Sequence, residues 1–209
     1  MGVVDHIKLY LITDDGRSRG RDVEEVVEAA VAGGVKMVQY RPLGLSDVDF
    51  ALKAARLRRI TRKAGVFFLI NGRPDIALQV GADGVHIGKK SMDIPAARRR
   101  LIDSGIVGFS AHSLEEAMKA QEDGADFVTF SPVFPTYSSS DPRPVVGVDA
   151  LKDLSGKLSI PVFPLGGIGL ENIEQIGAAG LRRAAVVSAI TEAADIKKAA
   201  EDLLAAIVA

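Results

Sequence analysis

Short runs of apolar residues alternate along the chain with longer stretches in which apolar positions recur three or four residues apart. A short apolar run bounded by turn residues is typical of a buried strand, and the longer period is typical of an amphipathic helix. Eight such alternations can be followed from one end of the chain to the other. We expect the strands, some with a leading turn, within residues 8–13, 36–41, 66–70, 81–88, 106–110, 124–130, 160–165 and 184–190.

Helix start and stop signals fall between these strands. Asp22 and Ser46 stand where helix N-caps are expected, and the helix after Ser46 should run to about Ala64. Ser113 and Glu116 have the spacing of a capping box. Further helices are expected over residues 74–80, from Asp93, from Asp149, near 170–178 and over 192–207.

The alternation of strands and helices predicts a parallel sheet covered by helices. A glycine-led turn recurs before every second strand, which suits a closed barrel because alternate strands supply alternate layers of its core. We therefore predict an α/β protein with a single (β/α)8 TIM-barrel domain over residues 1–209. A flavodoxin-like open sheet is the alternative, but its five strands would leave βα units unused. The turns are Gly34-Val35-Lys36, Gly81-Ala82-Asp83, Gly124-Ala125-Asp126 and Gly180-Leu181-Arg182.

Composition and charge narrow the class of protein. The chain has 209 residues, of which 47% are hydrophobic, and its formal net charge is -1. Proteins that bind nucleic acid need a basic surface, so we do not expect a nucleic-acid partner. The chain has no cysteine, no apolar stretch near the ~18 residues of a membrane span, and no export-signal pattern at its start. We therefore expect a cytoplasmic protein without disulfides, a thiolate metal site or a membrane partner.

Two strand ends near the C-terminus have the features of a phosphate-binding cup. The seventh strand is followed by Gly166 and Gly167, and the eighth by Val187 and Ser188. Glycine lets a ligand approach the backbone closely, and N–H groups at the point where a loop enters a helix attract anions. The loops after strands 7 and 8 of a TIM barrel lie side by side. We therefore expect these four residues to bind a phosphate group.

Polar residues at the ends of the earlier strands are candidates for substrate binding, because TIM-barrel sites form at that face. Gln39 and Arg41 point to the same side of the second strand, and Arg41 can bind a phosphate or carboxylate through two hydrogen bonds. A salt bridge at the rim is the alternative for Arg41. Asn71 either binds a ligand or caps the next helix. His86 either belongs to the site or is a buried structural histidine.

His112 is the candidate for catalysis. It follows Ser110, just past the fifth strand, in a turn of small residues before a capped helix. An imidazole at the barrel mouth has a pKa suited to proton transfer, whereas packing within the loop is the alternative. The long polar segment that follows the sixth strand offers the hydroxyls of Thr136 and Ser138, either to a ligand or to solvent. No paired histidines or clustered carboxylates indicate a metal site.

Together these segments resemble the thiamine phosphate synthase/TenI family. The resemblance covers most of the chain, from the second strand to the eighth. It implies a (β/α)8 barrel that acts on the thiazole phosphate half of thiamine, and dimers are common in the family. The matching motifs are Gln39-Tyr40-Arg41, Asn71, Gly81–Gly88, Gly108–Ser113, Gly124–Val128, Ser131–Thr136, Gly166–Ile168 and Val187–Ile190.

The family has two branches, and this sequence departs from the first of them. The synthase branch joins a pyrimidine diphosphate to thiazole phosphate with Mg²⁺, whereas the TenI branch is a thiazole tautomerase that moves a proton and needs no diphosphate site. Two acids of the synthase pattern are replaced by Gly72 and Ser91, and two lysines by Leu43 and by the serines at 138–140. Asp75 or Asp93 would be the acids left to hold Mg²⁺.

The resemblance and these departures predict a metal-independent thiazole tautomerase without a cofactor. His112 would transfer the proton, with a thiazole phosphate as the ligand. A thiamine phosphate synthase that uses Mg²⁺, a non-catalytic phosphate-binding regulator and another phosphate-binding barrel, such as a sugar-phosphate isomerase, remain as alternatives. The expected substrate contacts are Gln39, Arg41, Asn71, His86, Ser110, Thr136 and Ser138.

Overall fold

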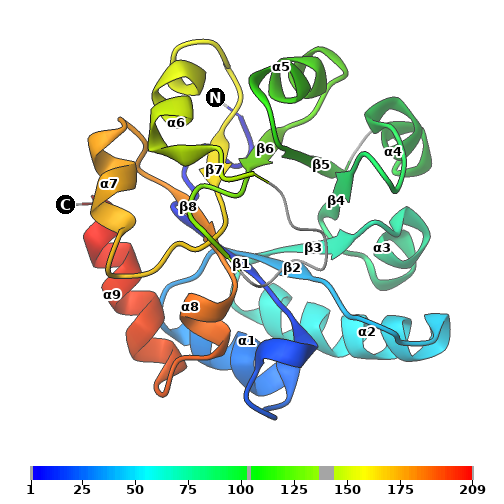
Figure 1. Cartoon of the computed structure of the whole chain (residues 1–209). Coiled ribbons are helices and arrows are strands. Elements are labelled where there is room, and N and C mark those ends of the chain that lie inside the picture. The colour runs from blue at the N-terminus through cyan, green and yellow to red at the C-terminus, as the bar shows by residue number, and fades with distance from the viewer. Residues whose placement is uncertain (1, 103–104, 137–143, 209) are drawn as a thin grey trace.

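The computed structural model describes residues 2–102, 105–136 and 144–208, which fold into a (β/α)8 barrel (Figure 1). Its parallel strands form one sheet in the order β7-β6-β5-β4-β3-β2-β1-β8. Strands β7 and β8 also contact each other, so the sheet curves round almost to closure, and the predicted TIM barrel is confirmed. The strands are β1 (Leu9–Ile12), β2 (Met37–Tyr40), β3 (Phe67–Asn71), β4 (Gly84–Gly88), β5 (Ile106–Ala111), β6 (Phe127–Phe130), β7 (Val162–Pro164) and β8 (Ala184–Val186).

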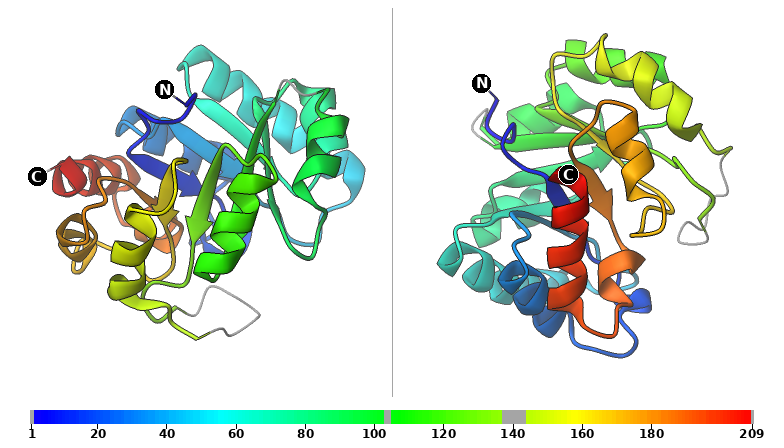
Figure 2. Two further views of the ribbon diagram at one scale, coloured as in Figure 1. Left: turned by 90° about the horizontal axis from the view of Figure 1, so that it is seen from above. Right: turned by 90° about the vertical axis from the view of Figure 1, so that its left-hand side faces the viewer.

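The helices form the outer ring of the barrel, and the last helix, α9, packs against the first, α1 (Figure 2). No described helix combines the length and the apolar character that a membrane crossing requires. The helices are η1 (Asp15–Arg17), α1 (Val23–Ala32), α2 (Asp47–Lys63), α3 (Pro74–Val80), α4 (Ile94–Arg100), α5 (Leu114–Glu122), α6 (Gly147–Ser155), α7 (Ile173–Ala178), α8 (Ser188–Thr191) and α9 (Ile196–Val208).

The apolar core has two parts, because successive strand residues point alternately inward and outward. The inner part fills the barrel, where the rings of Tyr10, Phe127 and Phe163 meet edge to face at 5.4–5.7 Å between centroids. Val4 and Ile7 join this cluster from the segment that precedes β1, so they close the N-terminal end of the barrel. The larger outer part packs the other strand face against the helices.

The recurring glycine-led turn has a structural role at the N-terminal end of the barrel. Asp126, before β6, accepts hydrogen bonds from the Val107 backbone N–H at 2.7 Å and from Arg98 at 2.5 Å. Asp83, before β4, accepts equivalent bonds from Phe68 N–H and from a two-pronged Arg58 contact. In both turns a carboxylate therefore ties the start of the preceding strand to an outer helix.

Several element ends differ from those expected. Residues 188–190, expected at the end of the last strand, lie in the short α8, and the helix expected over 192–207 begins only at Ile196. Helix α6 begins at Gly147, two residues before Asp149, and α7 begins at Ile173. Ser46 and Asp93 cap their helices as expected, whereas Asp22 occupies the N-cap position without a side-chain cap bond.

Candidate active site

A pocket of about 770 Å³ lies at the carboxyl ends of the strands. This volume suits a small phosphorylated heterocycle, since ligand pockets commonly measure ~300–1,000 Å³. The pocket unites residues from loops that are far apart in the sequence, as expected for a TIM barrel. Of the residues expected from the sequence, it is lined by Arg41, Asn71, Ser110, His112, Thr136, Gly166, Gly167, Val187 and Ser188. Ser138, which was also expected, lies outside the described residues.

The loops after β7 and β8 come together at one wall of this pocket. Gly166 and Gly167 have φ values of 98° and 62°, which favour glycine. A side chain at Gly167 would also lie 2.4 Å from the Pro135 carbonyl oxygen. Helix α8 begins at Ser188, and the first N–H groups of a helix have no partner within it. Among the described residues, no backbone hydrogen bond is recorded from the N–H of Gly166, Gly167 or Ser188.

Arg41 directly follows β2 and lines the pocket, and two hydrogen bonds to residues after β1 fix its position. Its guanidinium donates to the buried carboxylate of Asp14 at 3.1 Å, and its backbone N–H donates to the Thr13 hydroxyl at 3.1 Å. Its Nε is buried without a hydrogen-bond partner among the described residues. This N–H is closed to a ligand, whereas the Arg41 side chain as a whole is about 30% exposed and lines the pocket.

Asn71 ends β3 and lines the pocket. The N-cap position of α3 is occupied by Arg73, not by Asn71. Of the two roles considered from the sequence, helix capping is therefore not the one that Asn71 has here.

His112 lies just past β5 and has a defined hydrogen-bond partner. Its Nδ1 lies 2.7 Å from the Ser131 carbonyl oxygen, which can only accept. Nδ1 therefore carries the proton in the neutral ring, and Nε2 keeps the lone pair of a base. The backbone N–H of His112 donates to the Glu116 carboxylate at 2.9 Å, which fixes the turn. This arrangement suits general acid–base chemistry.

Gln39 and His86 differ from expectation, because they lie inside the barrel and are not among the residues that line the pocket. Both side chains are about 2% exposed, and both contact Tyr10. Burial lowers the pKa of His86 to about 3, with the charge of Arg41 as a second cause. His86 is thus the buried neutral histidine considered from the sequence. It still reaches the site indirectly, since its Nε2 lies 2.9 Å from Ser110 Oγ.

Several polar residues of the pocket are not among the substrate contacts expected from the sequence. Lys89 and Lys90 follow β4, and Lys89 pairs with Glu116 at 3.6 Å. The spacing of Ser113 and Glu116 predicted only a capping box, and Ser113 does accept from Glu116 N–H. In a capping box the Glu116 carboxylate would accept from the backbone N–H of Ser113. Here it accepts from the N–H of His112, one residue earlier, and so lies at the site.

Glu116 is the one carboxylate among the described residues that line this pocket, and it already bonds His112 N–H and Lys89, whereas Mg²⁺ prefers carboxylate oxygens. A side chain at residue 72 would contact Ser91 Cβ at 3.8 Å, so the two positions at which the synthase pattern carries acids adjoin. Asp75 binds Arg73, and Asp93 accepts from Ala96 N–H as the cap of α4. No metal-binding group of three or more suitable side chains occurs in the described part of the chain.

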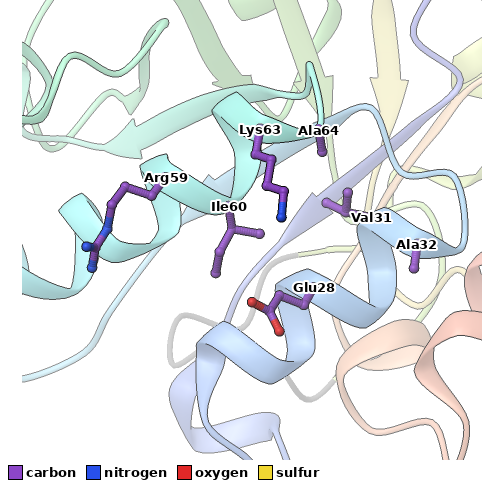
Figure 3. A pocket seen from close by; sticks show the side chains of 7 residues that line it. All are labelled: Glu28, Val31, Ala32, Arg59, Ile60, Lys63 and Ala64. Carbon is purple, nitrogen blue, oxygen red and sulfur yellow. The ribbon is translucent and has the colours of Figure 1, made fainter.

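A second hollow, of about 600 Å³, lies on the outer surface between α1 and α2 (Figure 3). Val31 and Ile60 project into it, with Glu28 and Lys63 beside them. It is separate from the strand ends and contains none of the candidate residues. We therefore place the functional site at the first pocket alone.

Fold and pocket together define a TIM barrel whose pocket lies at the carboxyl ends of its strands, where enzymes of this fold have their active sites. The sequence profile of the thiamine monophosphate synthase family, which includes the TenI proteins, matches residues 9–190. The chain belongs to this family.

Relatives match along almost the whole chain. The thiamine-phosphate synthase of Methanocella arvoryzae is 44% identical over 200 residues, covering 95% of this chain and 94% of that protein. That of Chloroflexus aurantiacus is 43% identical over 198 residues, covering 95% and 91%. The solved thiamine phosphate pyrophosphorylase from Pyrococcus furiosus superimposes with a TM-score of 0.88 at 34% identity, covering 97% and 96%. These names favour the transferase alternative over the isomerase expected from the sequence.

Proposed function

We propose that this protein is an isomerase that moves a proton on a thiazole phosphate without a metal ion. Two positions in the pocket wall carry the proposal. Residues 72 and 91 adjoin, and they are glycine and serine where the synthase pattern has two acids. A pocket that keeps the phosphate cup and a histidine, but lacks this carboxylate pair, suits proton transfer better than Mg²⁺-assisted loss of diphosphate.

In this proposal the phosphate of the substrate binds the N–H groups of Gly166, Gly167, Val187 and Ser188. Arg41, which follows β2 and lines the pocket with a partly exposed side chain, would bind a second anionic group. A substrate carboxylate there would gain a charge-assisted hydrogen bond from the guanidinium. The heterocycle then lies between the two anion-binding sites, next to Asn71 and His112.

His112 performs the proton transfer. Its Nε2 removes a proton from one ring atom of the substrate, and the resulting imidazolium returns a proton to another ring atom. The hydrogen bond from Nδ1 to the Ser131 carbonyl persists in both states and holds the ring in place. No atom is gained or lost, so the product is a tautomer of the substrate.

The test is an isomerisation assay with purified protein in a chelator. The thiazole carboxylate phosphate tautomer should be converted without added metal, and His112→Ala should lower kcat by about 10²–10⁴-fold. His6→Ala, which removes an exposed histidine before β1, is the matched control. An unchanged rate in His112→Ala would remove this histidine from the mechanism.

The second candidate is a thiamine-phosphate synthase, and the names of the relatives favour it. The same preparation is therefore given a pyrimidine diphosphate, thiazole phosphate and Mg²⁺. Formation of thiamine phosphate that depends on Mg²⁺ would establish the transferase and overturn the isomerase. Tight binding of thiazole phosphate with neither reaction would instead indicate a regulatory protein.

A further inference from the structure

A line of polar side chains crosses the interior of the barrel and ends at the pocket. Gln39 Nε2 lies 2.7 Å from Tyr10 Oη, which lies 3.3 Å from His86 Nδ1. On the other side of the imidazole, His86 Nε2 lies 2.9 Å from Ser110 Oγ. The first three side chains are buried, and Ser110 lines the pocket. Polar groups in an apolar core persist only when they are hydrogen-bonded, so their directions can be worked out.

The number of donors fixes the direction of each bond. The Gln39 amide donates to Tyr10 Oη, which leaves the single Tyr10 hydrogen for His86 Nδ1. Nδ1 is then an acceptor, so the neutral imidazole carries its proton on Nε2. That N–H donates to Ser110 Oγ. Because Ser110 Oγ accepts from the histidine, its own hydrogen is turned away from the ring.

The surroundings hold His86 in this state. Burial lowers the pKa of His86 to about 3 and raises the pKa of Tyr10 above its usual range, so both groups stay neutral. Gly108 stands opposite His86 in the sheet, and a Cβ there would lie 2.7 Å from His86 Nδ1. The glycine therefore leaves room for the imidazole. Thr129 Oγ1 lies farther from His86 Nε2 than Ser110 Oγ does, at 3.4 Å.

We infer that Gln39, Tyr10 and His86 are positioning residues that fix the Ser110 hydroxyl as a hydrogen-bond donor to an acceptor atom of the bound substrate. A donor with a fixed direction costs no reorientation when the ligand binds, which favours ligands with an acceptor at that point. The identity of the ligand as a thiazole phosphate rests on the proposed function. The direction of the hydrogen bonds from Gln39 to Ser110 is independent of the proposed function.

The first test reads the tautomer directly by ¹⁵N NMR of the protein labelled at histidine. The chain has only three histidines, His6, His86 and His112, so the ring signals can be assigned by substitution. His86 should be the Nε2–H tautomer without ligand, and should not titrate between about pH 5 and 8, whereas an ordinary histidine titrates near ~6.5. We call the hydrogen-bonded line from Gln39 through Tyr10 and His86 to Ser110 the relay. An Nδ1–H tautomer of His86, or a titration of His86 in this range, would overturn it.

The second test is a double-mutant cycle on the affinity for thiazole phosphate, measured by calorimetry. Ser110→Ala should weaken binding by about 3- to 10-fold, as expected for one neutral hydrogen bond. Tyr10→Phe should weaken binding by about 3-fold in the wild-type background and have no further effect in Ser110→Ala. Tyr40→Phe is the matched control, because the Tyr40 hydroxyl is also buried but belongs to the outer core cluster and has no partner among the described residues.

The outcomes separate the relay from the proposed function. Equal losses for Tyr10→Phe in both backgrounds would mean that Tyr10 does not act through Ser110, and the relay would fail. If wild-type protein does not bind thiazole phosphate, the proposed function fails, and the tautomer of His86 still decides the direction of the hydrogen bonds.

Discussion

At the scale of single residues, the site depends on a few positions that admit one kind of side chain. The two glycines after β7 combine a left-handed backbone with a close approach of the 132–135 segment, whose Phe134 N–H donates to the Gly166 carbonyl at 3.0 Å. The pair therefore shapes this part of the pocket in two ways. It turns the backbone, and it lets the neighbouring loop pack against that turn.

Gly167→Ala should be destabilising for both reasons. A non-glycine residue at φ 62° is strained, and its Cβ would lie 2.4 Å from a carbonyl oxygen. We expect the free energy of unfolding to fall by about 1–3 kcal/mol in urea titrations, and phosphate affinity to fall with it. Gly156→Ala is the control, since Gly156 has φ -100° and open space around it. Equal stability of the two variants would contradict the steric argument.

The buried His86 predicts a pH dependence of stability. Its folded-state pKa is lowered to about 3, whereas an unfolded histidine titrates near ~6.5. Below ~6.5 the unfolded chain binds a proton that the folded protein does not, so stability is full above this pH and is lost as the pH falls towards 3. The free energy of unfolding should fall by up to about 1.4 kcal/mol per pH unit from this group.

Urea titrations between about pH 5 and 6.5 isolate this effect, because most carboxylates titrate lower. His86→Gln should flatten the slope in this window, whatever its stability at neutral pH. His6→Gln should leave the slope as it is in the wild type, since His6 is exposed. The same slope in His86→Gln and wild type would show that His86 is not the group responsible.

At the scale of elements, the hydrophobic pattern predicted every strand, because a buried parallel strand is a continuous apolar run with clear turn signals. It did not predict the short α8, because the apolar run of the last strand continues through Ile190. No proline or glycine near Ser188 marks the end of β8, and the helix forms where the chain leaves this strand. The line from Gln39 to Ser110 was also beyond the sequence, because it depends on which barrel residues point inward and meet.

The aspartates of the recurring turns belong to this scale, since each connects a strand start to an outer helix. Asp126→Ala should lower the free energy of unfolding by about 2–4 kcal/mol, because it leaves Val107 N–H and Arg98 without their acceptor. Turnover at the opposite end of the barrel should persist in the folded fraction. Glu201→Ala, which removes an exposed partner of Lys197 on α9, should show little change in the same unfolding experiment. A mild effect at Asp126 would mean that the turn holds without its carboxylate.

At the scale of the whole molecule, one scaffold serves two chemistries in this family, and the fold alone does not choose between them. Identity of 44% along the chain shows the family, whereas the reaction depends on a few positions around the pocket. Residues 72 and 91 are such positions, because they come from different loops and adjoin only in the folded barrel. If their side chains decide whether a metal ion can bind, then two substitutions should create a metal site without altering the fold.

Gly72→Asp combined with Ser91→Asp should therefore give the protein an affinity for Mg²⁺. Aspartate tolerates the left-handed backbone of residue 72, where φ is 67°, better than most residues do. At a Mg²⁺ concentration about ten times Kd, binding should add about 1.4 kcal/mol to the stability, which is roughly 3–6 °C in Tm. The Gly72→Asn, Ser91→Asn pair has the same shape without the charge and should show no such shift. Equal stabilisation of both pairs by Mg²⁺, or of neither, would mean that these positions do not separate the two chemistries.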